Sequence, residues 1–256
     1  MTSSNAVSLK QLTHQPYNYV ICYPRPTLEQ ISIRIKELMK LHVKAIEFTG
    51  TKKVNNLDVL GKGYVGVVVI AYRNSKKVAL KIRRVDADRA SMHHEAEMLK
   101  QANKMKVGPE LLGETENFLL MEFIEGNLLN AWVEKLTERS RELRVSRVLR
   151  EILEQCWRLD EAGLDHGELS NASKHVIVNI FEKPVLVDFE TASTNRKTAN
   201  VTSICQYLFV GSQVAKILAK KLGKINQEEL IAMLKKYKKQ KTRKNFVNIL
   251  KACKIA

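Results

Sequence analysis

The sequence is poor in cysteine, proline and aromatic residues, and it has no long hydrophobic run. Its four cysteines lie far apart, with no CxxC pair and no histidine at metal-ligand spacing, so neither a zinc site nor a disulfide scaffold is expected. No apolar stretch approaches the roughly 20 residues that a membrane-spanning helix needs, so no membrane partner is expected. The first residues show no basic-then-apolar signal pattern, and we therefore expect a cytoplasmic protein.

Acidic residues are also scarce, and most of the resulting positive charge lies near the C-terminus. The 256 residues include 43 Lys and Arg against 27 Asp and Glu, which gives a formal net charge of +16. Residues 214–256 contain 13 of the basic and two of the acidic residues, a net +11. Hydrophobic residues make up 45% of the chain, enough for a sizeable core. We therefore expect a folded body with one strongly basic end.

The order of the predicted elements, strands first and helices afterwards, predicts an α+β fold with two segregated lobes. Thr27 is followed three residues later by Gln30, a capping-box pattern that predicts the start of a helix. We expect a small N-terminal α/β segment in residues 1–53, a β-rich lobe in 54–125 and a helical lobe with basic C-terminal helices in 126–256. The N-terminal segment is either a recognition element or a stabilising cover for the back of the β-rich lobe. Strands are predicted over 43–48, 54–60, 67–71, 78–83, 118–124, 176–180 and 185–187, with a hairpin turn at Asn74 and Ser75, and helices over 87–105, 130–162 and most of the remainder.

Residues 61–66, with the sequence GKGYVG, form a GxGxxG motif whose surroundings decide its meaning. A dinucleotide-binding motif must open a helix, whereas the β-branched residues that follow this one predict a strand. A glycine loop between two strands leaves backbone N–H groups free to cover a nucleotide triphosphate. The alternative is a glycine-rich hairpin without a ligand.

One lysine, Lys81, ends the hydrophobic run of residues 78–80 and is expected in a strand. A buried lysine is costly unless it meets an anion. The following predicted helix places Glu95 beside its apolar stripe, whereas Glu97 falls on the polar side. Protein kinases pair such a strand lysine with a helix glutamate and use it to hold nucleotide phosphates. The alternative for Glu95 is an ordinary surface carboxylate.

Three later segments, residues 119–126 (LLMEFIEG), 166–173 (HGELSNAS) and 187–190 (VDFE), resemble the hinge, the catalytic loop and the magnesium-binding segment of protein kinases. The HG-type loop, the DFE sequence and the lack of an APE segment resemble the atypical kinases, which include the RIO family and the kinase of the KEOPS complex. Among these, a predicted serine/threonine kinase group of archaea is the most similar. The resemblance covers about residues 57–210 and implies a bilobal protein-kinase-like fold with ATP and magnesium as cofactors.

The resemblance also implies a role for each matching residue. Glu168 would be the catalytic base, and Lys81 with Glu95 would form the phosphate-binding ion pair. Asp188 and Ser173 would hold magnesium. The residues expected to contact ATP are Gly61, Lys62, Gly63, Tyr64, Val65, Gly66, Val68, Ala79 and Lys81, with the backbone of Glu122 and Ile124 at the adenine.

Two of these positions depart from the family pattern. Glu168 stands where these kinases carry aspartate, and Ser173 stands where they carry asparagine, while Asn171 is two positions early.

We expect an ATP- and magnesium-dependent serine/threonine protein kinase that phosphorylates a protein hydroxyl, on an unidentified substrate or on itself. One alternative is a catalytically weak ATPase or pseudokinase switch in a ribosome- or tRNA-associated assembly. Another is a phosphotransferase that acts on a small molecule or on RNA.

The basic residues of the C-terminal region cluster in residues 235–244 (KKYKKQKTRK), between apolar residues at helical spacing. We expect the apolar stripe to pack on the helical lobe and the lysines to form one solvated face. This face either only keeps the protein in solution or contacts structured RNA or a ribosomal particle through backbone phosphates. The resemblance supports the second interpretation, because the related kinases work around ribosome maturation and tRNA modification.

Overall fold

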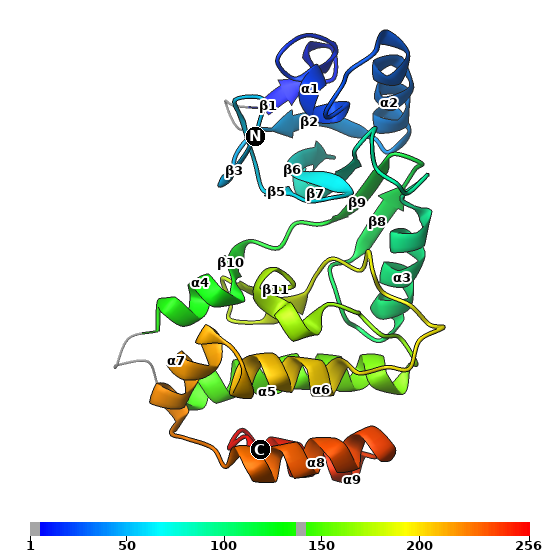
Figure 1. Cartoon of the computed structure of the whole chain (residues 1–256). Helices are drawn as coiled ribbons and strands as arrows, with labels where there is room; N and C mark the ends of the chain where they lie inside the picture. Colours follow the sequence, from blue (N-terminus) through cyan, green and yellow to red (C-terminus); the bar gives the residue numbers. More distant parts are fainter. Residues whose placement is uncertain (1–5, 137–141) are drawn as a thin grey trace. The chain divides into compact units, whose positions relative to one another are not determined.

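A computed structural model describes residues 6–136 and 142–256 of the chain. The chain forms two compact units, the sheet unit (residues 1–97 and 110–123) and the helical unit (residues 98–109 and 124–256). The fold is α+β, with 44% of residues in helices and 22% in strands. An antiparallel sheet dominates the first unit and helices dominate the second, which confirms the predicted fold class (Figure 1).

The sheet unit is built on one antiparallel sheet, whose strands are β1 (Ala6–Ser8), β2 (Val43–Glu47), β5 (Gly61–Lys62), β6 (Gly66–Arg73), β7 (Lys76–Arg83), β8 (Leu111–Glu114) and β9 (Phe118–Glu122). Their order is β1-β2-β6-β7-β9-β8, with β5 paired to β6. The turn of the central β6–β7 hairpin is formed by Asn74 and Ser75, as predicted. Both have positive φ, 49° and 61°, as the tight turns favoured in hairpins require.

Residues 54–60, predicted as one strand, instead contribute to a two-stranded hairpin of β3 (Lys52–Val54) and β4 (Leu57–Val59). Asn55 and Asn56 form its turn, with φ of 44° and 66°. Asparagine tolerates this left-handed conformation because its short side chain bonds to the nearby backbone. The single-strand prediction was wrong because it overlooked this pair.

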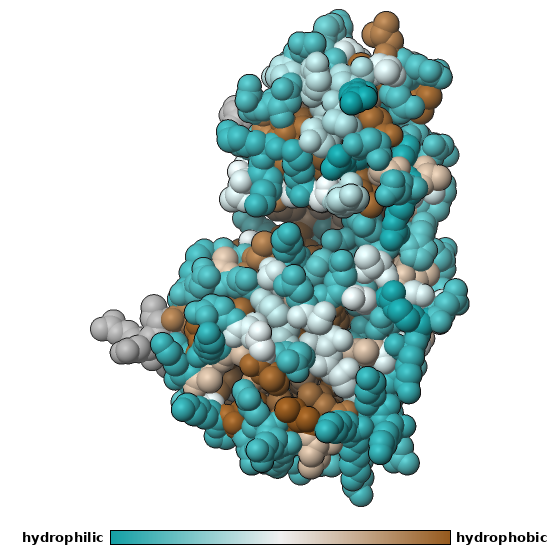
Figure 2. Space-filling model, viewed as in Figure 1, coloured by the Kyte–Doolittle hydropathy of each residue, from teal (hydrophilic) through white to brown (hydrophobic). Residues whose placement is uncertain are grey.

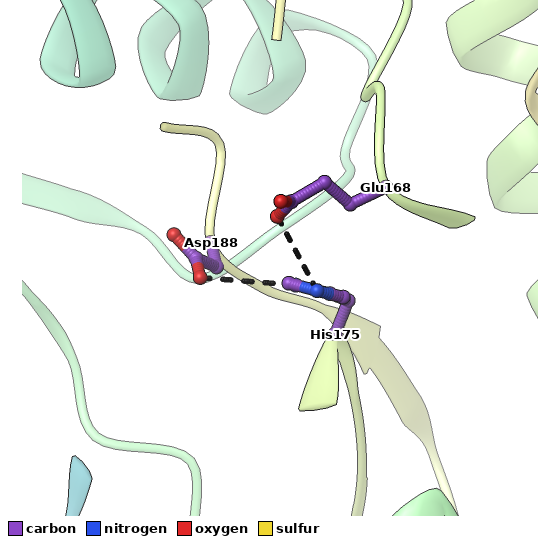
Figure 3. A group of neighbouring side chains, drawn as sticks. All are labelled: Glu168, His175 and Asp188. Atoms are coloured by element: carbon purple, nitrogen blue, oxygen red, sulfur yellow. Dashed lines mark ion pairs between the residues drawn. The ribbon is translucent and has the colours of Figure 1, made fainter. Parts of the chain in front are cut away.

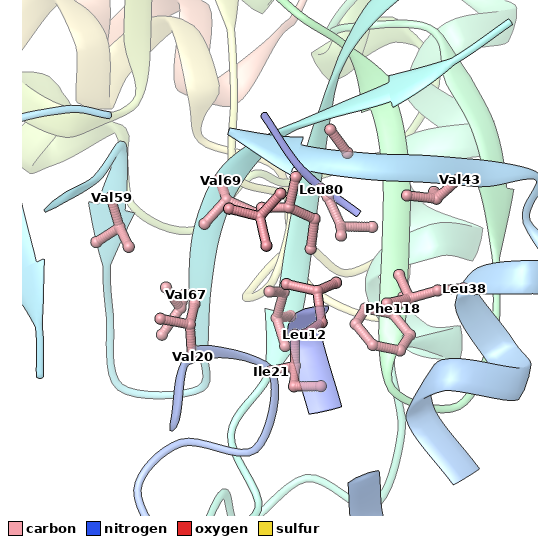
Figure 4. Close-up of a cluster of buried hydrophobic side chains, with 14 of the residues drawn as sticks. Leu12, Val20, Ile21, Leu38, Val43, Val59, Val67, Val69, Leu80 and Phe118 are labelled. Carbon is pink, nitrogen blue, oxygen red and sulfur yellow. The ribbon is translucent and has the colours of Figure 1, made fainter. Parts of the chain in front are cut away.

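The N-terminal segment covers one face of the sheet. It contains η1 (Gln11–Thr13), α1 (Asn18–Ile21) and α2 (Leu28–Lys40). Its contribution to the core supports the stabilising alternative for residues 1–53. The buried residues that meet there are Leu12, Val20, Ile21 and Leu38 from this segment and Val67, Val69, Leu80 and Phe118 from the sheet (Figure 4).

The helical unit contains the small sheet β10 (Gly126–Leu128), β11 (Val176–Asn179) and β12 (Pro184–Leu186). The β11–β12 hairpin confirms the prediction for residues 176–187, whereas β10 was not predicted. The helical segments of this unit are α4 (Leu129–Glu134), α5 (Glu142–Glu161), η2 (Leu169–Lys174), α6 (Asn200–Cys205), η3 (Gln206–Val210), α7 (Gln213–Leu222), α8 (Gln227–Lys239) and α9 (Arg243–Ala252). The boundary between the two units falls inside α3 (His93–Lys104).

The predicted helix starts differ in how well they match the structure. α2 begins as predicted, because the Thr27 side chain accepts a hydrogen bond from the backbone N–H of Gln30 at 3.2 Å. α3 begins at His93 rather than at residue 87. The single helix predicted over 130–162 comprises α4 and α5, and residues 137–141 between them lie outside the described part of the chain.

The C-terminal helices α8 and α9 bury their apolar stripe, as predicted. Leu230, Tyr237, Phe246 and Ile249 are fully buried, whereas the lysines of α8 are exposed. Figure 2 shows that hydrophilic side chains cover most of the visible face of the chain. Within residues 6–136 and 142–256, no helix is long and apolar enough to cross a membrane.

Candidate functional site

Lys81 and Glu95 form a buried ion pair in the sheet unit. Their side chains are 8% and 5% exposed, and Nζ of Lys81 lies 2.8 Å from Oε2 and 2.9 Å from Oε1 of Glu95. The pair joins β7 to the first turn of α3. Glu97 is exposed, so the prediction that Glu95 faces inward is confirmed and the surface alternative is wrong. Burying two charges costs several kcal/mol per ion before their attraction is counted, so stability alone does not account for this pair.

The ion pair lies on the sheet face opposite to the one that the N-terminal segment covers. Lys81 pairs with Val68 across the β6–β7 ladder, and Ala79 lies two residues before it, so the three side chains share a face. Gly61 is opposite Val68 in the β5–β6 ladder and joins the same face. Leu80, between Ala79 and Lys81, points into the core. The strand register therefore brings together four of the residues predicted to contact ATP.

The glycine motif is a tight turn between β5 and β6. The N–H of Gly63 donates to the carbonyl of Gly66 at 2.8 Å, and the chain then continues directly into β6. The predicted order of strand, loop and strand is thus confirmed. A Cβ at Gly66 would lie 2.9 Å from the carbonyl oxygen of Ile82 and 3.2 Å from Cγ of Lys81. Glycine is needed here because any larger residue would push the loop away from the lysine.

The side chains in the glycine turn differ in exposure. Tyr64 is 86% exposed, whereas Val65 is buried. Nζ of Lys62 lies 4.6 Å from the centre of the Tyr23 ring, a cation–π distance. The turn therefore offers its backbone and one aromatic ring to a ligand, while Lys62 is already engaged.

A second group of predicted residues lies in the helical unit, at the two ends of η2. Glu168 precedes η2, His175 follows it, and Asp188 comes two residues after β12. Nε2 of His175 lies 3.3 Å from Oε2 of Glu168, and Nδ1 of His175 lies 3.7 Å from Oδ2 of Asp188 (Figure 3). One donor atom from each residue lies within 4.8 Å of the other two. The predicted base and the predicted metal ligand are therefore neighbours, linked by a histidine.

Backbone contacts hold Asp188 and His175 in register. The N–H of Val187 donates to the carbonyl of His175 at 3.0 Å. The next residue, Asp188, has a φ of +69°, which is uncommon for any residue other than glycine. Such backbone strain costs on the order of 1–3 kcal/mol and clusters at functional sites. The left-handed backbone at Asp188 sets the direction in which its carboxylate leaves the chain.

His166 supports this arrangement from inside the unit. It is fully buried, its backbone N–H donates to Oδ1 of Asn200 at 2.8 Å, and its Nε2 lies 3.1 Å from the carbonyl of Val187. Burial, together with neighbouring His175, lowers the pKa of His166 to about 4. The ring is therefore neutral near pH 7, and Nε2 must carry the proton because a carbonyl can only accept.

Two buried aspartates anchor the loop that carries His166. Asp165 accepts the backbone N–H of Ala199 at 2.9 Å and Nε of Arg196 at 2.8 Å. Asp160 accepts both the backbone N–H and the side-chain amide of Asn200, at 3.0 and 2.9 Å. These contacts fix the entry to η2 and so position Glu168.

The remaining predicted site residues make local contacts of their own. The Ser173 hydroxyl donates to Oδ1 of Asn171 at 3.2 Å. The backbone N–H of Glu122, at the end of β9, donates to the carbonyl of Glu110 at 2.9 Å. Ile124 belongs to the helical unit, whereas Glu122 belongs to the sheet unit. The roles predicted for Ser173 at a metal and for Glu122 and Ile124 at an adenine stay predictions.

No family model matches the chain. It is similar to an uncharacterized protein of Methanocaldococcus jannaschii, with 32% identity over 121 residues. The match covers 46% of this chain and 99% of that relative. The chain belongs to the family of this archaeal protein. Because the relative is uncharacterized, the family adds no activity, and function has to be argued from the residues themselves.

His175 is a residue of the site that the sequence did not indicate. His175 lies two positions after Ser173, at the entry to a strand whose Val176 and Val178 are buried. That pattern predicts only a half-buried strand residue, with no metal-ligand spacing to another histidine or cysteine. Its neighbours Glu168 and Asp188 are 7 and 13 positions away, and only the fold brings them to it.

Proposed function

We propose that the chain is an ATP- and magnesium-dependent atypical serine/threonine protein kinase, which transfers the γ-phosphate of ATP to a protein hydroxyl. The buried Lys81–Glu95 pair is the observation that carries the proposal. It keeps an ammonium group in one place, on the sheet face that also bears Gly61, Val68 and Ala79. A fixed lysine beside a glycine loop between two strands is the arrangement with which kinases hold nucleotide phosphates.

In this proposal each group has one task. The ammonium of Lys81 binds phosphate oxygens, and Glu95 keeps it oriented. Backbone N–H groups of residues 61–66 lie over the phosphate chain. Glu168 accepts the proton of the attacking hydroxyl as the bond from that oxygen to the γ-phosphorus forms and the bond to the β-phosphate oxygen breaks.

The donor set of the helical unit fits a divalent cation. Asp188 supplies carboxylate oxygens, which hard cations prefer, and its side chain is 38% exposed. Asp188 would hold magnesium as the principal ligand. When bound, magnesium would neutralise charge on the phosphates during transfer.

A catalytically weak ATPase or pseudokinase switch is the second candidate, and the surroundings of Ser173 favour it. The serine hydroxyl is engaged with Asn171, and a hydroxyl is a weaker ligand than an amide oxygen for a hard cation. Glu168 also carries its carboxylate one methylene further out than aspartate would. A misplacement of about 1 Å can cost on the order of 100-fold in rate.

Transfer of radiolabel from γ-labelled ATP tests the two candidates against each other. A kinase labels protein, this chain or an added acceptor, and Glu168→Ala abolishes the labelling. A switch hydrolyses ATP slowly or not at all and labels nothing, yet still gains thermal stability from Mg-ATP. If millimolar Mg-ATP produces neither labelling nor a thermal shift, both candidates are wrong.

We further propose that the exposed face of α8 and α9 contacts the phosphate backbone of structured RNA, free or in a ribosomal particle. Lys235, Lys236, Lys238 and Lys239 are all exposed. Arg243 instead pairs with Glu154 at 2.6 Å and is engaged by the fold. The lysines can therefore replace counterions on a polyanion without giving up a contact within the chain.

RNA binding across a salt series tests this face. Changing the four lysines of α8 to glutamine should weaken binding and flatten the log–log salt slope by about the number of phosphates that the variant no longer neutralises. The matched control changes four exposed lysines of the sheet unit to glutamine: Lys40, Lys44, Lys52 and Lys76. An equal effect of both variants would indicate net charge rather than a binding face, and an unchanged slope would leave α8 without this role.

A further inference from the structure

The proposed function leaves His175 without a task. The residue is 8% exposed, and its Nδ1 atom is buried without a hydrogen-bond partner in the described part of the chain. Nδ1 faces Oδ2 of Asp188 at 3.7 Å, beyond the range of a hydrogen bond. A buried polar atom without a partner costs about 1–3 kcal/mol. A cation between the ring and the carboxylate would remove that cost.

We propose that Glu168, His175 and Asp188 bind one divalent transition-metal ion, with Mn²⁺ and Zn²⁺ favoured over Mg²⁺. Carboxylates bind all three ions, so the imidazole decides the selectivity. Imidazole nitrogen is a common ligand of transition metals, whereas Mg²⁺ takes oxygen ligands and retains its waters. The two carboxylates also balance the charge of a divalent ion.

His175 and Asp188 are already placed for such an ion, and Glu168 reaches it by a change of side-chain rotamer. Metal–ligand bonds of about 2.1 Å place donor atoms about 3.5 Å apart around a tetrahedral ion. Nδ1 of His175 and Oδ2 of Asp188 are already 3.7 Å apart. Glu168 lies within the 4.8 Å that spans the group, but its Oε2 faces Nε2 of the ring at 3.3 Å, so its 39% exposed side chain has to turn toward Nδ1 to complete the site. Figure 3 shows the two carboxylates reaching toward the imidazole from separate segments.

His175 and Asp188 are held in place before an ion arrives. The hydrogen bond from Val187 to the His175 carbonyl joins the segments that carry the two ligands, at 3.0 Å. The left-handed backbone of Asp188 sets the direction of its carboxylate. Ligands held in place in this way lose little conformational entropy on binding.

Binding of this ion in the absence of nucleotide does not rest on the proposed function, which uses Glu168 as the base. The test therefore omits nucleotide and titrates the full chain with Mn²⁺, following the loss of the free-ion signal by electron paramagnetic resonance. We expect one site with at least tenfold preference for Mn²⁺ over Mg²⁺ in competition. Spin-echo modulation should show one nitrogen bonded directly to the manganese, and Zn²⁺ should displace it.

Replacement of the histidine isolates its part. In His175→Leu the nitrogen modulation should vanish and Mn²⁺ affinity should fall at least tenfold, the range seen when metal-site partners are removed. Affinity for Mg²⁺, which depends on the carboxylates, should change less than threefold. The matched control is His93→Gln, because His93 is an exposed histidine that also pairs with a carboxylate, that of Glu114. This control should keep both the affinity and the nitrogen signal.

Several outcomes would overturn the inference. A manganese site without bonded nitrogen would do so, as would His175→Leu binding Mn²⁺ like the wild type. Should His175→Leu fail to fold, Asp188→Asn removes a ligand while preserving shape and must lose the same site. If the chain binds Mn²⁺ through nitrogen but does not bind ATP, the proposed function is wrong and the metal site stands. If the chain binds ATP but shows no nitrogen-bonded Mn²⁺, the metal site is wrong and the proposed function stands.

Discussion

Nζ of Lys81 lies 2.8 Å from Oε2 of Glu95, with less than a tenth of either side chain exposed. The two charges depend on each other in this environment. Removing one partner leaves the other buried without compensation, whereas replacing both with apolar groups removes the desolvation cost as well. The pair therefore allows its contribution to stability to be separated from its contribution to ligand binding.

Lys81→Ala should lower the free energy of unfolding by about 3–5 kcal/mol, because Glu95 keeps its burial and loses its counter-charge. The double variant Lys81→Met with Glu95→Leu should recover most of that loss. Urea denaturation of the three proteins measures both effects. If Lys81→Ala is as stable as the wild type, the Lys81–Glu95 pair is exposed to water in solution.

The same double variant tests nucleotide binding in a folded protein. Mg-ATP should raise the melting temperature of the wild type, because a ligand bound only by the native state adds about 2.7 kcal/mol at 100 times its dissociation constant. The double variant should show no shift, since it lacks the phosphate-binding ammonium. Equal shifts in both proteins would place ATP elsewhere on the chain.

Glu168→Gln should reduce phosphoryl transfer by at least about 100-fold and leave ATP affinity nearly unchanged. The amide keeps the size of the side chain but cannot accept the hydroxyl proton. Single-turnover kinetics with γ-labelled ATP separate transfer from binding. A wild-type rate in this variant would remove Glu168 from the catalytic role and favour the switch alternative. The double variant Glu168→Asp with Ser173→Asn carries the residues of the kinases that the sequence resembles, and it should raise the rate of phosphoryl transfer.

The sequence was sufficient wherever a local rule decides the structure. Thr27 caps α2 through the neighbouring Gln30, and the Asn74–Ser75 pair turns the β6–β7 hairpin. Lys81, expected in a strand because it ends a hydrophobic run, lies in β7. Each of these features depends on residues within a few positions of one another.

The features that were missed depend on distant contacts or on an overlooked pair. Asn55 and Asn56 carry the same turn signal as the pair at 74 and 75, but it was not recognised within an apolar stretch. The association of His175 with Glu168 and Asp188 depends on the contact between the residue after η2 and the segment that follows β12. Nothing in the spacing of these three residues predicts it, because metal-site patterns in sequence rely on short, repeated intervals.

Arg34 is the basis of a prediction about the N-terminal segment. It is fully buried, and its guanidinium donates to the carbonyls of Ile21 and Arg83 at 2.7 and 2.6 Å and to Oδ1 of Asn117 at 2.9 Å. Burial lowers its pKa to about 10, so it stays charged at neutral pH.

Arg34→Lys should lower the free energy of unfolding by about 2–4 kcal/mol, because one ammonium cannot reach three separated acceptors and each one left unpaired costs about 1–3 kcal/mol. Arg25→Lys, at an exposed position, is the control and should change stability by less than about 0.5 kcal/mol. Urea denaturation compares them. Equal stability of the two variants would mean that the N-terminal segment is not held to the sheet through this residue.

Tyr237 joins the basic helix α8 to the core of the helical unit. It is fully buried, and its hydroxyl donates to Oδ2 of Asp160 at 2.9 Å. Burial and the nearby carboxylate raise the pKa of Tyr237 well above its usual range, so the hydroxyl keeps its proton. Tyr237→Phe should cost about 1.5–3 kcal/mol, the value of a hydrogen bond to a charged group.

Lys238→Gln, one position along the same helix and exposed, is the control and should cost less than about 0.5 kcal/mol. Because Tyr237 acts on stability and the lysine on charge, the two variants should also separate in RNA binding. Tyr237→Phe should leave the salt slope unchanged below its melting temperature, whereas Lys238→Gln should reduce it. If Tyr237→Phe unfolds at the same urea concentration as the wild type, α8 is held by its apolar stripe alone and Asp160 is satisfied by Asn200.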